Sequence, residues 1–142
     1  MRQRFTGHQE LGEAYRGLLD LCDRLEALAD SIPHRIDGAS CRMILAELPE
    51  RLKQVHALEE SILFPAVEDQ RTAKDRDALI ERLRAEHDHD DQAAAELGRV
   101  LQAVLDDRAS LGWDAIGYML RAFFETVRRH VATERLLLAA CA

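Results

Sequence analysis

Apolar residues recur at intervals of three and four along four long stretches of the chain, with polar residues between them. This spacing is typical of amphipathic helices that bury one face. In the first stretch the buried stripe would consist of Leu11, Leu18, Cys22, Leu25 and Leu28. The pattern predicts helices over Thr6 to Ser31, over Ala39 to Glu68, from after Asp75 to near Asp107, and over Trp113 to Leu138.

Short polar or helix-breaking segments separate these stretches. Pro33 ends the first, and either Asp37 or Ser40 can cap the helix that follows. Pro49 and Pro65 fall inside the second stretch, where each removes a backbone donor and clashes with the preceding turn. We therefore expect that helix to bend or start late at the first proline and to kink or end near the second. Four helices of similar length with short connections predict an all-α fold, an up-down-up-down antiparallel four-helix bundle.

Composition supports a single helical domain over residues 1–142, because the chain has 47% hydrophobic residues, 32% charged residues and only seven Gly and three Pro. A net charge of −7 and a pI near 5.3 argue against nucleic acid or an anionic membrane as a partner.

The irregular spacing of Cys22, Cys41 and Cys141 predicts reduced thiols in a cytoplasmic protein. No apolar run has the length of a signal peptide or a membrane span.

Three of the four predicted helices carry histidines and acids near their centres. His56 and Glu60 lie four residues apart, as do His130 and Glu134, and His87 lies in the helix between them. Residues four apart on a helix point the same way. Burying these groups without compensation would cost several kcal/mol each, roughly, and a bound cation removes that cost. Imidazole and carboxylate ligands together suit divalent iron, manganese or zinc.

The positions of these residues along the helices can be compared by counting. In an antiparallel hairpin two residues lie level when their mean position falls in the connecting loop. The mean of His56 and His87 falls in the loop around Thr72, and that of His87 and His130 falls in the loop around Arg108. Tyr15 is level with His56 by the same count, so the first helix is expected to offer a phenol to the site rather than an imidazole.

Several alternatives remain open for individual residues. Without a metal, the histidines and acids would form a hydrogen-bonded polar network in a plain bundle. Asp91, four residues after His87, is a further ligand, the acceptor that orients an imidazole, or a solvated charge. Tyr15 is either a phenolate ligand or, as we favour, a hydrogen-bond donor to Glu60, Glu134 or a metal-bound water. Glu59, three residues after His56, either reaches the edge of the site or, as we favour, forms an exposed salt bridge. The acidic run from Asp88 to Asp91 is otherwise expected to be exposed surface.

These residues carry a resemblance to a known family. The segments His56-Ala-Leu-Glu-Glu60-Ser-Ile-Leu-Phe-Pro65, Glu86-His87 and Arg129-His130-Val-Ala-Thr-Glu134 resemble the hemerythrin-like, or HHE cation-binding, family over almost the whole chain. The resemblance implies a four-helix bundle around a non-haem di-iron centre, bridged by carboxylates and an oxo or hydroxo group. It also implies roles in binding dioxygen or nitric oxide, in sensing oxygen or redox state, or in handling iron.

The resemblance implies metal ligands at His56, Glu60, His87, His130 and Glu134. It places Tyr15 where the family has its first-helix histidine, and Asp91 where oxygen carriers have a second third-helix histidine. We therefore expect a di-iron protein with a modified site, which acts through a small ligand such as dioxygen or nitric oxide. Zinc or manganese is a possible substitute for iron. The rival hypotheses are a di-iron oxidase or peroxidase that uses Tyr15 as a proton or electron donor, and a bundle with a single-metal or degenerate site that serves as an interaction module.

Overall fold

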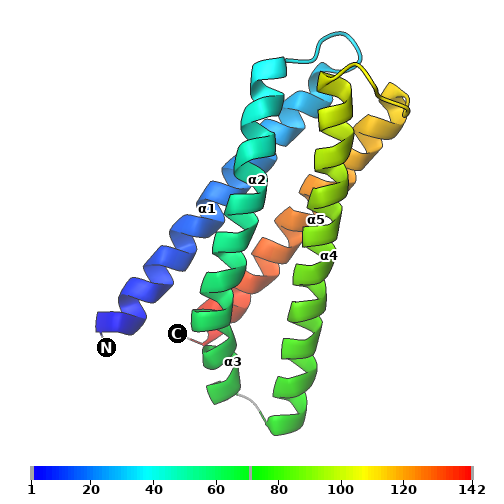
Figure 1. Cartoon of the computed structure of the whole chain (residues 1–142). Coiled ribbons are helices and arrows are strands. Elements are labelled where there is room, and N and C mark those ends of the chain that lie inside the picture. The colour runs from blue at the N-terminus through cyan, green and yellow to red at the C-terminus, as the bar shows by residue number, and fades with distance from the viewer. Residues whose placement is uncertain (1, 71, 142) are drawn as a thin grey trace.

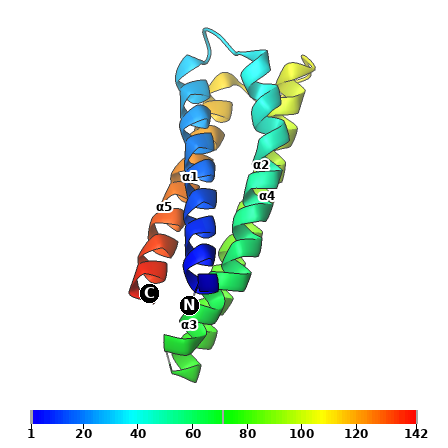
Figure 2. The same cartoon turned by 90° about the vertical axis from the view of Figure 1, so that its left-hand side faces the viewer.

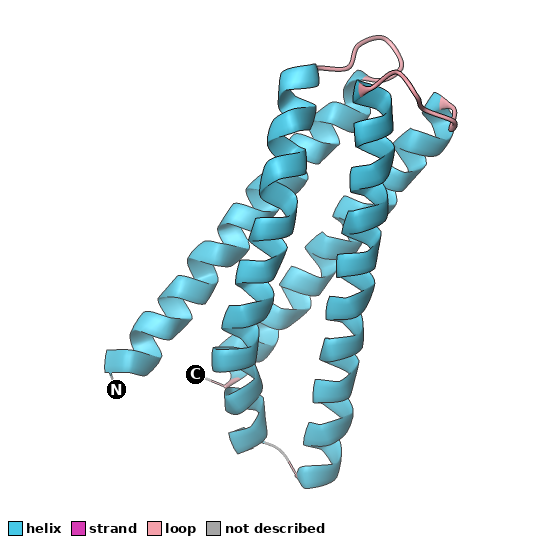
Figure 3. Ribbon diagram, viewed as in Figure 1, coloured by secondary structure: helices cyan, strands magenta, loops and turns pink. Residues whose placement is uncertain are grey.

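Four helical rods make up the described part of the chain, residues 2–70 and 72–141 of a computed structural model (Figure 3). The second rod is not one uniform helix, because a short π-helix interrupts it. The elements are α1 (Arg2–Ser31), α2 (Gly38–Leu58), the π-helix η1 (Glu59–Leu63), α3 (Phe64–Gln70), α4 (Ala73–Leu105) and α5 (Trp113–Ala140). The expected all-α fold is confirmed. No helix among the described residues is long and apolar enough to cross a membrane.

Successive rods run in opposite directions, as expected for an up-down-up-down bundle (Figure 1). The rods α1 and α4 each pack against both α2 and α5, so the bundle is four-sided with every chain neighbour also a neighbour in space. Figure 2 shows α1 beside α5 and α2 beside α4. As a result, α4 lies between α2 and α5 and can present side chains to both.

The helix starts follow from local capping groups. The Asp37 carboxylate accepts hydrogen bonds from the backbone N–H groups of Ala39 and Ser40 at 3.0 and 3.3 Å, so Asp37 caps α2 as one of the two expected candidates. Thr72 caps α4 by accepting from the Asp75 backbone N–H. Because of this cap, α4 already begins at Ala73, inside the segment that the sequence pattern assigned to the preceding loop.

The core contains most of the predicted apolar stripes, together with Leu21 and Ile44, which the periodic pattern did not include. Burial of a leucine, isoleucine or phenylalanine side chain contributes roughly 1.5–3 kcal/mol, so these stripes hold the rods together. The residues with at most 1% exposure include Leu11, Leu21 and Leu25 from α1, Ile44 from α2, Leu63 from η1, Leu97 and Leu101 from α4, and Ile116, Leu120 and Phe124 from α5. Pro49 lies inside α2 without ending it, so the expectation of a late start at that proline was wrong.

The π-helix η1 arises from the spacing of buried residues in the second rod. Val55, Glu59, Leu63 and Val67 are each at most 2% exposed, and they follow one another at intervals of four. Three such intervals exceed three α-helical turns of about 3.6 residues by about one residue. A π turn takes up this extra residue, and Pro65 favours it because proline lacks the N–H that an α-helical turn would donate. Of the two alternatives expected near Pro65, the end of the helix is wrong, because the rod continues as α3 to Gln70; the irregularity in this segment is the π turn over Glu59–Leu63.

Candidate metal centre

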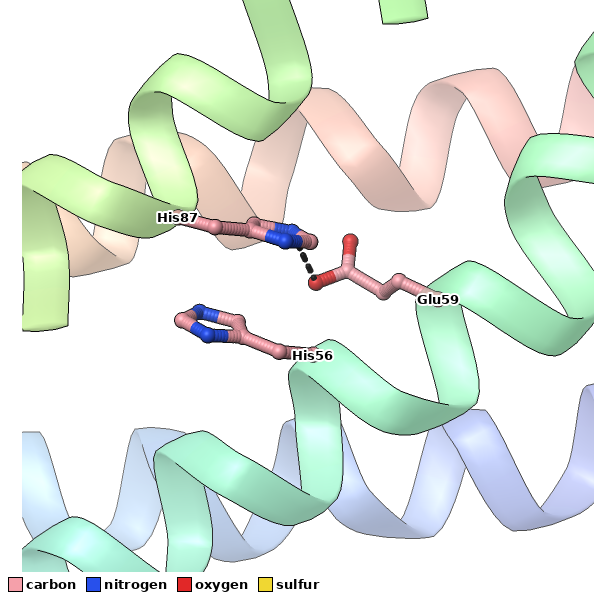
Figure 4. Close-up of side chains that lie close together, drawn as sticks. All are labelled: His56, Glu59 and His87. Carbon is pink, nitrogen blue, oxygen red and sulfur yellow. Dashed lines mark hydrogen bonds and ion pairs between the residues drawn. The ribbon is translucent and has the colours of Figure 1, made fainter.

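Two imidazoles and one carboxylate meet where α2 and η1 face α4 (Figure 4). His56, Glu59 and His87 each offer one ligand atom, and these atoms all lie within 4.8 Å of one another. The His87 Nε2 lies 3.2 Å from Glu59 Oε1, and the rings of His56 and His87 are stacked with centroids 3.9 Å apart and an interplanar angle of 10°. The count of positions thus correctly predicted that His56 and His87 are level.

The carboxylate in this cluster comes from Glu59 and not from Glu60, which corrects the sequence-based expectation for both residues. Glu59 is 1% exposed, whereas the Glu60 side chain is 46% exposed and lies 3.4 Å from the Arg84 guanidinium on the surface. The buried stripe runs through Val55 and Glu59, so His56 lies on the flank of this stripe that faces α4. Glu60 lies four residues further along this flank, at its solvent-exposed edge, where its carboxylate meets Arg84 of α4.

Tyr15 supplies the contribution of α1 to the centre. Its side chain is 0% exposed, and its hydroxyl donates a hydrogen bond to Glu59 Oε2 at 3.0 Å. Burial, followed by the negative charges of Glu59 and Glu134, raises the pKa of Tyr15 far above its usual range. The phenol is therefore protonated and acts as a hydrogen-bond donor, and its protein partner is Glu59 in place of the expected Glu60 or Glu134.

Glu134 brings a second carboxyl group to the centre from α5. It is 3% exposed, and burial together with the nearby charge of Glu59 and a hydrogen bond to it raises the pKa of Glu134 to about 10. Two carboxyl groups share a small buried volume, so only one of them readily carries a charge in the absence of a cation. A bound cation would remove this repulsion, and the pair can therefore receive positive charge.

His130 lies beside Asp90, an acid that the sequence pattern placed on the surface. Asp90 is in fact 5% exposed, and its Oδ2 lies 2.7 Å from His130 Nδ1. This hydrogen bond raises the pKa of His130 despite partial burial of the ring. The other ring nitrogen, Nε2, is 4.0 Å from Glu86. His130 is therefore paired with acids of α4 and is not part of the compact cluster found among the described residues.

Asp91 lies on the flank of α4 that faces α2, against His56. Its Oδ1 is 3.3 Å from His56 Nδ1, and its side chain is 57% exposed. Burial, followed by the neighbouring His87, lowers the pKa of His56. Asp91 therefore meets the imidazole of His56 as an ion pair at the exposed edge of the site. The buried position of Asp90 could have been inferred from its spacing, because it lies three residues after His87 on the same helix.

The donor set fits a divalent cation. The buried carboxylate of Glu59 accepts from Tyr15 at Oε2 and lies against His87 at Oε1, and each oxygen can accept more than one bond. Two neutral imidazoles and a carboxylate within 4.8 Å suit iron, manganese or zinc, which prefer mixed nitrogen and oxygen ligands. The fold and this cluster together define a helical-bundle domain with a candidate cation site.

A comparison with family models agrees with this class. The chain matches the family model described as hemerythrin HHE cation binding domain over residues 7–142. The chain therefore belongs to the hemerythrin HHE cation-binding domain family, as its His and Glu motifs indicated. No curated protein and no solved structure was found to match it.

Proposed function

We propose that this domain binds a pair of iron ions and uses them to bind or sense dioxygen, nitric oxide or redox state, or to handle iron. The observation that carries the proposal is the buried cluster of His56, Glu59 and His87, whose ligand atoms lie within 4.8 Å of one another. Glu134, from α5, adds a second carboxyl group beside Glu59. The proposal also assigns a ligand role to His130 of the same helix, which in the metal-free protein is paired with Asp90. When bound, iron would supply reversible redox chemistry and open positions for a small ligand.

The arrangement of the two stacked imidazoles supports two ions rather than one. A histidine holds a metal in the plane of its ring, through a nitrogen lone pair. The rings of His56 and His87 are nearly parallel with centroids 3.9 Å apart, so one ion cannot lie in both ring planes without a rotation of one ring. Paired metal ions in proteins are typically about 3.5–4 Å apart, which matches one ion in each plane.

A groove along the seam of α2 and α4 supports the binding of a small ligand. It has a volume of about 630 Å³, and Leu52, Ala94 and Gly98 give it a largely apolar lining. His56 and Asp91 also line the groove. Dioxygen and nitric oxide are small and nearly apolar, so such a groove favours their access to His56.

The thiols support a reducing, cytoplasmic location as part of the same proposal. Cys22, Cys41 and Cys141 are all free, and the first two are buried. Burial raises the pKa of the Cys22 thiol to about 12, so it is unreactive and packs as a small apolar residue.

Metal analysis after anaerobic reconstitution with ferrous iron tests the proposal. We expect about two irons per chain, near-ultraviolet and visible absorption bands on exposure to air, and weaker retention of manganese in competition with ferrous iron. One ion per chain would favour the single-metal alternative. Absence of stoichiometric metal from a folded bundle would refute the proposal and favour a bundle that serves as an interaction module.

A further inference from the structure

Three residues within about one turn of α4 contact side chains of the centre. His87, Asp90 and Asp91 are spaced at i, i+3 and i+4, so their side chains point to the same side of α4, with Asp90 and Asp91 about 100° apart around the axis. Because α4 packs against both α2 and α5, this angle directs the two aspartates to different neighbouring helices.

Each aspartate lies at the Nδ1 atom of a different histidine. Asp90 Oδ2 is 2.7 Å from His130 Nδ1, and Asp91 Oδ1 is 3.3 Å from His56 Nδ1. The Asp90 contact is a hydrogen bond, and because a carboxylate oxygen only accepts, it requires a proton on Nδ1 of His130. The Asp91 contact is an ion pair, and the negative charge beside Nδ1 of His56 favours a proton on that nitrogen. In the neutral ring the lone pair is then on Nε2.

We infer that Asp90 and Asp91 are a pair of positioning residues that hold His130 and His56 in the Nδ1–H form, so that both rings present Nε2 to the metal. The inference rests on the proposed function for the metal, but the orientation itself is a property of the metal-free protein. Histidine ligands commonly donate their second N–H to a carboxylate, which fixes the ring and raises its basicity as a ligand.

The two aspartates differ in exposure, so their removal should affect the histidines to different degrees. Asp90 is 5% exposed, and no solvent competes strongly for its hydrogen bond. Asp91 has a longer contact and a side chain that is 57% exposed, so water can replace it in part. Removal of the Asp90 carboxylate is therefore expected to have the larger effect.

The tautomer of each ring is measured first, by nitrogen NMR of the imidazoles in the metal-free protein at about pH 9, where neutral rings predominate. We expect the Nδ1–H form for His130 and His56 in the wild type. Asp90→Leu should shift only His130 toward the Nε2–H form, and Asp91→Leu should shift only His56. Asp90→Asn should keep the Nδ1–H form, because the amide oxygen still accepts. Asp88→Asn, an exposed residue of the same helix, is the control for charge and should change neither ring.

The ferrous iron affinity of the same variants is measured second. The Asp90→Leu change should weaken iron binding by roughly 10–100-fold, and Asp90→Asn should weaken it much less, while Asp88→Asn should match the wild type. An Nε2–H tautomer in the wild type, or an unchanged tautomer or iron affinity in Asp90→Leu, would overturn the inference. If the wild type binds no iron, the proposed function fails, and the tautomers still decide whether the aspartates orient the rings.

Discussion

Adjacent glutamates with opposite surroundings give the sharpest test of the centre. Glu59→Gln and Glu60→Gln make the same chemical change one residue apart, and each keeps the size of the side chain. Glu59 is 1% exposed and contacts the Tyr15 hydroxyl at 3.0 Å and His87 Nε2 at 3.2 Å. Glu60 forms a surface pair with Arg84, which solvent screens strongly. Only the first change should affect the metal.

The metal-free protein is expected to tolerate Glu59→Gln because two opposing effects are similar in size. The change weakens two hydrogen bonds to a charged acceptor, worth about 1.5–3 kcal/mol each. It also removes a buried charge, whose desolvation costs several kcal/mol, roughly. The melting temperature without metal should therefore stay close to that of the wild type.

The metal-dependent stability should separate the variants. At a free metal concentration about 1,000 times the Kd, binding stabilises the native state by about 4.1 kcal/mol. At about 3 °C per kcal/mol for a chain of this length, the melting temperature rises by roughly 12 °C. Loss of a residue that orients a metal ligand weakens metal binding by up to about 100-fold. Loss of the ligand Glu59 itself should weaken metal binding at least as much. Glu59→Gln should then lower the stabilisation to about 1.4 kcal/mol and the shift to roughly 4 °C.

The assay is thermal unfolding by circular dichroism, with and without ferrous iron under anaerobic conditions, together with the iron content after desalting. Glu60→Gln should retain the full shift and the wild-type iron content. The opposite pattern, with Glu60→Gln losing the shift and Glu59→Gln retaining it, would refute the assignment of the buried carboxylate and the π-helical register that places it.

Three further predictions concern α1, the start of α2 and the metal itself. Tyr15→Phe should keep the iron content but lower stability by about 1–3 kcal/mol in chemical denaturation, because Glu59 loses its buried donor. The hydrogen bonds from Ser40 hold the pKa of Asp37 below its usual range, so this cap stabilises the fold above the ordinary aspartate pKa and loses its effect as pH falls through the lowered value. The gap in stability between the wild type and Asp37→Ala should accordingly narrow as pH falls below about 4. A chelator should lower the melting temperature of the iron-loaded protein to that of the metal-free protein, and an equal melting temperature before and after chelation would show that no metal is bound.

The apolar and polar pattern was sufficient to predict the fold. Intervals of three and four fix which face of each helix is buried, and short connections leave an antiparallel bundle as the simple arrangement. Equal rise per residue in all helices made it possible to predict that His56 and His87 are level. The family motifs agreed with this arrangement and led to the expectation of a cation, which the family match supports.

The identity of the buried acids depended on the tertiary structure. A periodic pattern locates a helical face only to within about half a turn, and Glu59 and Glu60 both fall inside that range. The choice between them came from the buried residues Val55, Glu59 and Leu63, which follow one another at intervals of four. A π turn in this segment keeps all three on the buried face of the rod.

Sequence alone therefore determined the rods, their order and the height of the histidines, because these depend on local periodicity and on constant helical rise. The tertiary structure decided the rotation of each rod about its axis, because neighbouring helices compete for the same buried face. That rotation turned Glu60 outward, brought Glu59 against Tyr15 and His87, and buried Asp90 beside His130.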